Sequence, residues 1–91
     1  MISPELLEWL KNWEGPPHYA PREDPVSPGV YDIGYGHVCA RDRPPITPFQ
    51  AEEILRADAD TFAAVVEQLV PGGLLQHEAD ALTAFCFNVG R

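Results

Sequence analysis

Positive charge is scarce in this sequence. Its 91 residues include six lysines and arginines against 14 aspartates and glutamates, which gives a formal net charge of −8. Proteins bind nucleic acid largely through lysine and arginine contacts to phosphate, so this balance argues against nucleic acid as a partner. It also offers no electrostatic attraction to an anionic surface.

Long apolar runs are also absent. No stretch of about eighteen apolar residues occurs, and a helix that spans a membrane needs roughly that length. The first residues, Met1-Ile2-Ser3-Pro4, lack the basic region and apolar core of a secretory signal. We therefore expect no membrane span, and synthesis in the cytoplasm with any export by another route.

Cysteine is rare as well. Two cysteines, Cys39 and Cys86, cannot form a disulfide framework. His37 and Cys39 lie close in sequence, with His18 and Cys86 as remote ligands, but these positions lack the spacing of a known zinc site. We expect no metal and no cofactor.

The residues that are present indicate one α+β domain over residues 1–91. Hydrophobic content of 45% and two tryptophans are typical of a folded chain. We expect a β-rich unit over residues 16–46 that carries the candidate site. A central helix over residues 47–70 and a third helix over residues 74–90 should follow it.

We expect a first helix that ends at or next to Glu14, the first candidate catalytic carboxylate. Ser3 suits the N-cap, and apolar residues recur at three- and four-residue spacing before Gly15. Glu14 is then the last or next-to-last helical residue, beside Trp13. Desolvation by the aromatic ring and the negative end of the helix dipole both disfavour the ionised carboxylate, which favours a proton donor. A solvated surface glutamate explains the same position equally well.

More acids follow in a proline-rich span. Residues 16–29 read as a loop with one short strand, because prolines at positions 21, 25 and 28 exclude a regular central strand. Glu23 and Asp24 lie here, and base rates favour a solvated turn for them. Val30 to Val38 is predicted as one strand, with Asp32, Gly34 and Gly36 on one face. Its glycines indicate close approach of another backbone or a ligand.

The predicted central helix carries a charged residue, Asp58, on its apolar side. Thr47 and Gln50 form a capping box. Asp58 falls within the predicted apolar stripe, where an unpaired charge is costly, and His37 is the best partner for it. The stripe comprises Ala51, Ile54, Leu55, Phe62, Val65, Val66 and Leu69.

The third helix should bury a second apolar stripe. The stripe follows the 0, 3, 4, 7 pattern through Leu82, Phe85, Cys86 and Val89. Asn88 interrupts the apolar run and is either a cap partner or a residue that faces a cleft.

Several short motifs occur in a fixed order along the chain: Trp13-Glu14-Gly15, Asp24-Pro25-Val26, Ile33-Gly34-Tyr35-Gly36-His37, Gln50-Ala51, and Phe85-Cys86-Phe87-Asn88-Val89-Gly90. In this order the chain resembles the phage-type lysozymes, the endolysins of the muramidase glycoside hydrolase family 24. The resemblance covers nearly the whole chain. It implies a lysozyme-like α+β fold and cleavage of the β-1,4 bond between N-acetylmuramic acid and N-acetylglucosamine in peptidoglycan.

The resemblance also implies roles for residues. Glu14 matches the catalytic glutamate of the family, and Asp24 best matches its second carboxylate. Asp58 matches an aspartate that pairs with the histidine at His37.

We further expect Tyr35 and Asn88 to contact the glycan strands. The resemblance also implies that the chain stays in a host cytoplasm before it is released to the periplasm or cell wall.

Three departures from the family pattern stand out. Asp32 occupies a position that is normally threonine; an acid there is able to serve as base or nucleophile, or to repel Asp24 and spoil the site. The spacing from Glu14 to the strand that contains Asp32 is longer than usual, with the extra residues between Pro21 and Pro28. This leaves Glu23 open as an alternative to Asp24. The family also continues beyond this third helix, so we expect a truncated lower lobe, exposed apolar surface and self-association. The alternatives to an enzyme are a module that binds glycan or protein without cleavage, and a fragment that a second chain completes.

Overall fold

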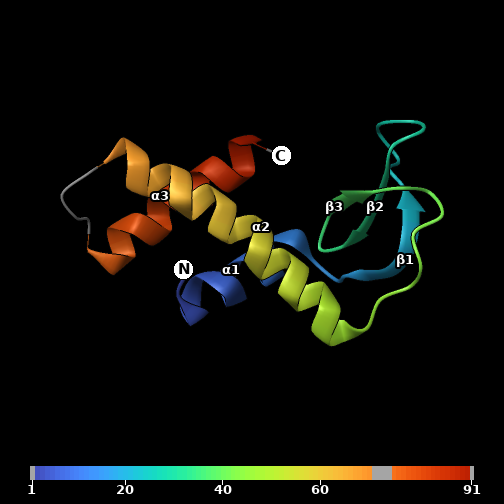
Figure 1. Cartoon of the computed structure of the whole chain (residues 1–91), viewed down its shortest axis with the longest axis horizontal. Coiled ribbons are helices and arrows are strands. Elements are labelled where there is room, and N and C mark those ends of the chain that lie inside the picture. Colours follow the sequence, from blue (N-terminus) through green and yellow to red (C-terminus); the bar gives the residue numbers. More distant parts are fainter. Residues whose placement is uncertain (1, 71–74, 91) are drawn as a thin grey trace.

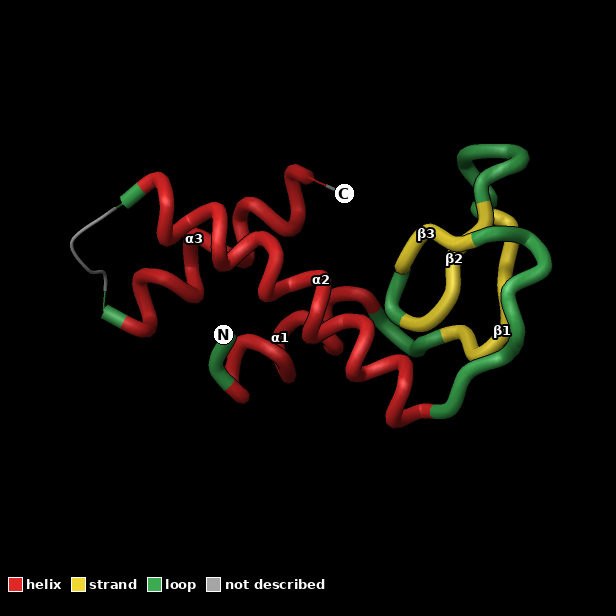
Figure 2. The backbone as a smooth tube through the Cα atoms, viewed as in Figure 1, coloured by secondary structure: helices red, strands yellow, loops and turns green. Residues whose placement is uncertain are grey.

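The computed structural model describes residues 2–70 and 75–90. The elements follow in the order α1 (Pro4–Glu14), β1 (His18–Glu23), β2 (Tyr31–Gly34), β3 (His37–Cys39), α2 (Pro48–Leu69) and α3 (Gln76–Gly90). Helix α2 extends from the sheet at one end of the molecule to α3 at the other (Figure 1). Strands and helices are segregated rather than alternating (Figure 2), and this confirms the α+β class.

The ends of α1 are set by local chemistry. The Ser3 side chain accepts a hydrogen bond of 3.1 Å from the Leu6 N–H, and Pro4 follows as the first helical residue. At the other end Gly15 adopts a φ of 78° and its N–H donates to the Lys11 carbonyl. Only glycine adopts such a conformation readily. Glu14 is therefore the last residue of α1, as the sequence predicted.

The sheet is antiparallel with the strand order β1-β2-β3. The prediction of a single strand over residues 30–38 is wrong, because a turn at Tyr35 and Gly36 divides it into β2 and β3. Gly34 and Gly36 have φ values of 65° and 87°, a left-handed backbone conformation that ends a strand. A Cβ at Gly34 would make only ordinary contacts with Ile46 and Ala51, so conformation rather than space requires this glycine.

Strand β1 is longer than expected and contains Pro21. Proline cannot donate to a sheet ladder, but β1 lies at the edge of the sheet. Its pairing with β2 shifts register between His18 and Arg22, as a bulge does. The edge position and the irregular pairing together accommodate Pro21.

Helix α2 connects the two ends of the molecule. Thr47 and Gln50 form the predicted capping box, and the helix ends at Leu69. Val65 and Leu69, both assigned to the buried stripe, are exposed. The buried face is instead rich in small residues, which allow close packing against β2 and α3. It comprises Ala51, Leu55, Ala59, Ala63 and Val66.

Helix α3 buries a different face from the predicted one. Leu82, Phe85 and Val89 are exposed, whereas Thr83 and Phe87 are fully buried. The Phe87 ring meets Phe62 of α2 edge to face, with centroids 5.6 Å apart. The helix begins at Gln76; the predicted start at residue 74 lies outside the described residues.

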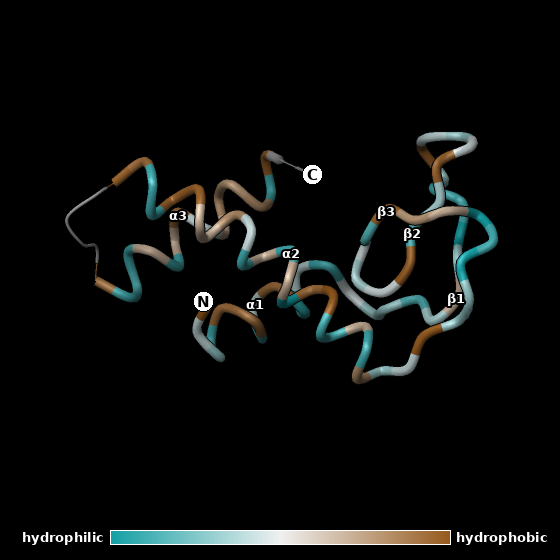
Figure 3. The backbone as a smooth tube through the Cα atoms, viewed as in Figure 1, coloured by the Kyte–Doolittle hydropathy of each residue, from teal (hydrophilic) through white to brown (hydrophobic). Residues whose placement is uncertain are grey.

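The main core lies among the three helices. Apolar residues concentrate in the helices, whereas β1 is mainly hydrophilic (Figure 3). Two hydrogen bonds connect the start of α1 to the other helices. The Ile2 N–H donates to Asp60 of α2, and the Ser3 hydroxyl donates to Asp80 of α3. The core comprises Ile2, Leu6, Leu7, Leu10, Leu55, Ala59, Ala63 and Phe87.

Candidate active site

Glu14 lies where α1 meets the sheet. Because it is the last helical residue, its side chain leaves the helix beside the turn between β2 and β3. There it lines a cavity of about 310 Å³. The other lining residues are Pro16, His18, Arg22, Asp32, Gly34, Tyr35 and Gly36.

A second cavity of about 400 Å³ adjoins the first. Asp32 and Gly36 line both cavities, so they form the wall between them. The second cavity is bounded by Asp24, Val30, Asp32, Gly36, His37, Val38, Asp58, Thr61 and Phe62. The structure thus brings Glu14 and Asp32 to one cavity and Asp24 and Asp32 to the next.

Asp32 is a buried carboxylate. It is 7% exposed and pairs across the strands with Arg22, whose Nη2 lies 3.3 Å from Asp32 Oδ2. Within the described part of the chain, Asp32 Oδ1 is buried without a hydrogen-bond partner. An unsatisfied buried oxygen is costly, so Asp32 is held in this position at the expense of stability.

Glu23 and Asp24, the two neighbouring acids of the proline-rich span, differ in their surroundings. Asp24 Oδ1 accepts hydrogen bonds of 2.8 and 3.2 Å from the N–H groups of Val26 and Ser27. Asp24 also lines the second cavity. Glu23 is exposed, accepts a bond from the Gly29 N–H and lines neither cavity. This arrangement favours Asp24 over Glu23 as a site residue.

The expected contact between His37 and Asp58 forms. His37 Nδ1 lies 2.8 Å from Asp58 Oδ2, with both side chains partly exposed. The contact joins β3 to α2 along the wall of the second cavity. Asp58 is partly exposed on this wall rather than buried within the apolar stripe as the sequence predicted, and His37 is its partner there.

The two residues expected to contact glycan lie in different places. Tyr35 lines the Glu14 cavity and packs against the helical core. Asn88 lines neither cavity of the acidic residues. It borders a separate groove of about 500 Å³ between α1 and α3, together with Trp9 and Phe85.

The pattern of the sequence did not identify Arg22 as a site residue. Its position depends on the register that sets Arg22 opposite Asp32, and this register includes an irregularity that no local pattern specifies. His18, which pairs with Gly34 in the same sheet, lines the same cavity. Within residues 2–70 and 75–90, no group of three or more His, Cys, Asp or Glu side chains is arranged to hold a metal ion.

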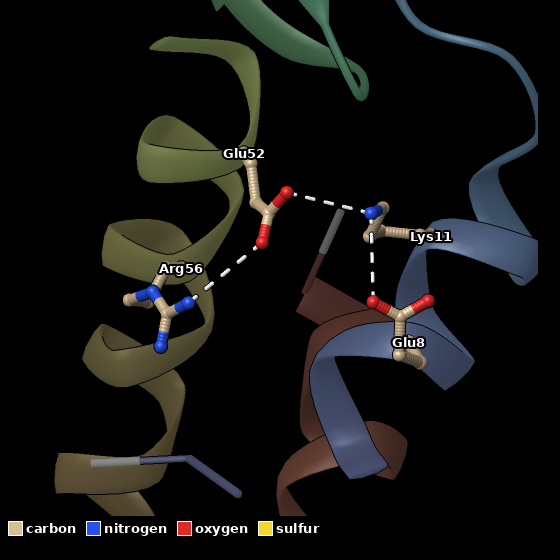
Figure 4. Close-up of polar contacts among 4 residues, drawn as sticks. All are labelled: Glu8, Lys11, Glu52 and Arg56. Atoms are coloured by element: carbon tan, nitrogen blue, oxygen red, sulfur yellow. Dashed lines mark hydrogen bonds and ion pairs between the residues drawn. The ribbon is translucent and has the colours of Figure 1, made fainter. Parts of the chain in front are cut away.

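Lys11 connects the helix that carries Glu14 to α2, and Arg56 lies at the outer edge of the same charge cluster. Lys11, one turn before Glu14, lies between Glu8 at 3.5 Å and Glu52 of α2 at 3.4 Å, and Glu52 also meets Arg56 (Figure 4). Desolvation acts to lower the pKa of Lys11, but the hydrogen bond and charge of Glu52 and the charge of Glu8 raise it overall. Lys11 therefore stays a cation that links α1 to α2.

Known proteins are similar to this chain in sequence and in fold. The sequence model of the family described as "Phage lysozyme" matches residues 11–91. An endolysin from Bacillus phage PZA is 35% identical over 98% of this chain, although the chain spans only 35% of that relative's length. The chain spans about a third of the length of the curated relatives it matches.

Solved structures of related proteins have a similar fold. The muramidase domain of SpmX from Asticaccaulis excentricus superposes with a TM-score of 0.81 at 36% identity, covering 99% of this chain and 60% of that one. An endolysin from the Escherichia coli phage FAHEc1 gives a TM-score of 0.79 at 32% identity, covering 98% of this chain and 58% of that one. This chain belongs to the phage lysozyme family.

Proposed function

We propose that this chain is a peptidoglycan hydrolase. It cleaves the β-1,4 bond between N-acetylmuramic acid and N-acetylglucosamine, with Glu14 as the general acid. One observation carries this proposal: Glu14 at the end of α1 and Asp32 line one cavity, and Asp32 and Asp24 line the next. Paired carboxylates on a cleft are the groups that glycoside hydrolysis needs.

In the proposed mechanism, Glu14 donates a proton to the glycosidic oxygen while the sugar develops oxocarbenium character. A carboxylate opposite, Asp32 or Asp24, stabilises that positive charge or activates water. The separation of the carboxyl groups determines whether the anomeric configuration is inverted or retained. The His37–Asp58 contact has a structural role here, because it holds β3 and the wall of the cavity against α2.

The proposed partner is a peptidoglycan glycan strand, which Tyr35 contacts in the Glu14 cavity. No helix in the described ranges is long and apolar enough to cross a membrane. The names of the curated relatives, endolysins of Bacillus phages, support synthesis in a host cytoplasm before release to the cell wall.

A module that binds glycan without cleaving it is the second candidate. The buried Asp32, with one oxygen lacking a partner among the described residues, favours this alternative, because a third carboxylate between Glu14 and Asp24 adds repulsion to the cleft. Binding alone predicts that purified peptidoglycan retains the chain without release of reducing sugar.

Activity on purified peptidoglycan tests the proposal. The wild-type chain should release reducing ends and clear permeabilised Gram-negative cells. Glu14→Gln should lose at least about 100-fold in rate, because the amide cannot donate the proton. Glu5→Gln is the matched control, since Glu5 lies on α1 outside the Glu14 cavity. Full lytic activity of Glu14→Gln would refute the assignment.

A further inference from the structure

Arg22 is the only lysine or arginine among the described residues that line the two cavities. Four carboxylates line the same space: Glu14, Asp24, Asp32 and Asp58. The whole chain carries a net charge of −8. The surrounding acids repel a carboxylate on a bound glycan, and a cation at this position offsets that repulsion.

We propose that Arg22 binds a carboxylate of the glycan strand and thereby selects anionic glycans. This inference rests on the proposed function for the identity of the glycan, but it concerns binding and not cleavage. Carboxylates in this substrate class have two sources, namely the lactyl group of muramic acid and the attached stem peptide.

The geometry leaves the guanidinium available. Nη2 makes a 3.3 Å contact with Asp32 Oδ2, and the Arg22 side chain is 47% exposed. A guanidinium has five N–H donors in a planar fork. One contact with Asp32 fixes the orientation of the fork, and the remaining donors can pair with a second carboxylate at the cavity mouth.

Asp32 supports this role of Arg22 from the neighbouring strand. The two residues are register partners on β1 and β2, so the sheet determines where the guanidinium sits. Asp32 is almost fully buried, which makes it a fixed anchor, and the exposed end of the pair is the arginine. A cation held in this way loses little conformational entropy when it binds an anion.

Binding affinity tests the inference without any dependence on catalysis. The chain carries Glu14→Gln to prevent turnover, and calorimetry measures the Kd for soluble glycan strands. One set of strands is stripped of peptides, so that lactyl carboxylates are free; a second set has these carboxylates converted to amides; a third retains the stem peptides. Arg22, Arg22→Gln and Arg22→Lys are compared on each.

Arg56→Gln is the matched control. Arg56 is similarly exposed at 42% and also forms one ion pair, with Glu52, but it lines neither cavity. We expect Arg22→Gln to weaken binding of a carboxylate-bearing strand about tenfold, as loss of a charge-assisted hydrogen bond does. Arg22→Lys should retain part of the affinity because it keeps the charge. Arg56→Gln should change nothing.

For each variant, the ratio of its affinity for carboxylate-bearing strands to its affinity for amidated strands separates a loss of the carboxylate contact from a folding defect, because a folding defect weakens binding of both. Amidated strands should bind equally well to Arg22 and Arg22→Gln. An Arg22 effect on the stripped strands assigns the carboxylate to the lactyl group, and an effect confined to the third set assigns it to the stem peptide. Equal losses on charged and amidated strands, or no loss on any charged strand, would overturn the inference. Absence of cleavage by the wild-type chain would instead refute the proposed function alone.

Discussion

Asp32 carries a cost that a threonine at this position would not. Its carboxylate is buried, yet only Oδ2 is paired, with Arg22, and Oδ1 has no partner among the described residues. Burying a charge with incomplete pairing is destabilising. A buried polar atom without a partner calls for an explanation, and a role in the site is one that fits the position of Asp32 in the wall between the two cavities.

We predict that Asp32 is the base or nucleophile opposite Glu14. Asp32→Asn should lower the rate of peptidoglycan cleavage about 10²- to 10⁴-fold, the usual contribution of a positioned acid or base. The substitution keeps the size of the side chain, and unfolding by urea should show no loss of stability. Undiminished cleavage by Asp32→Asn would instead assign the second carboxylate to Asp24, and Asp24→Asn would then be the inactive variant.

At the scale of the element, α3 shows how a helix face is chosen. Its apolar residues occur on more than one side, so their spacing is compatible with either of two buried faces. Phe87 packs edge to face with Phe62 and lies in the core, while Phe85 faces outward. The partners supplied by α1 and α2 decide the orientation.

Two phenylalanines two residues apart make this orientation testable. Phe87 is 0% exposed and Phe85 is 65% exposed. Phe87→Ala should lower the free energy of unfolding by about 3–5 kcal/mol, because it leaves a cavity in the core. In a dilute solution of the monomer, Phe85→Ala should change it by less than about 0.5 kcal/mol, as surface substitutions do. Urea denaturation followed by tryptophan fluorescence measures both, and equal losses would contradict the observed orientation of α3.

At the scale of the whole molecule, the helical end exposes apolar surface. Trp9 and Trp13 stack on α1 with centroids 5.5 Å apart and remain exposed. Trp9 and Phe85 line the groove between α1 and α3, and Leu82 and Val89 are exposed further along α3. Large apolar patches of this kind mark interaction surfaces.

We predict that the chain self-associates through this end. Light scattering at micromolar concentration should give a mass above that of one chain. Phe85→Glu should return the mass to that of one chain, because it places a charge in the contact. Phe49→Glu is the control, since Phe49 is 72% exposed at the opposite end of α2. A wild-type chain that scatters as a monomer would refute the prediction.

The sequence alone determined features that depend on local chemistry. Ser3 and Gly15 delimit α1, and Thr47 with Gln50 begins α2, because caps satisfy backbone groups within a few residues. The position of Glu14 at a helix end follows directly from these caps. Even the contact between His37 and Asp58 could be anticipated, because a charge on an apolar stripe needs a partner.

Tertiary structure alone decided what depends on distant partners. The turn after Gly34 divides a run that alternates like one strand, and the irregular register of β1 sets Arg22 against Asp32. The packing of α3 buries Phe87 and leaves Asn88 on a groove apart from Glu14. Alternation and helical spacing specify which residues share a face, but the free energy of burial depends on what packs against that face.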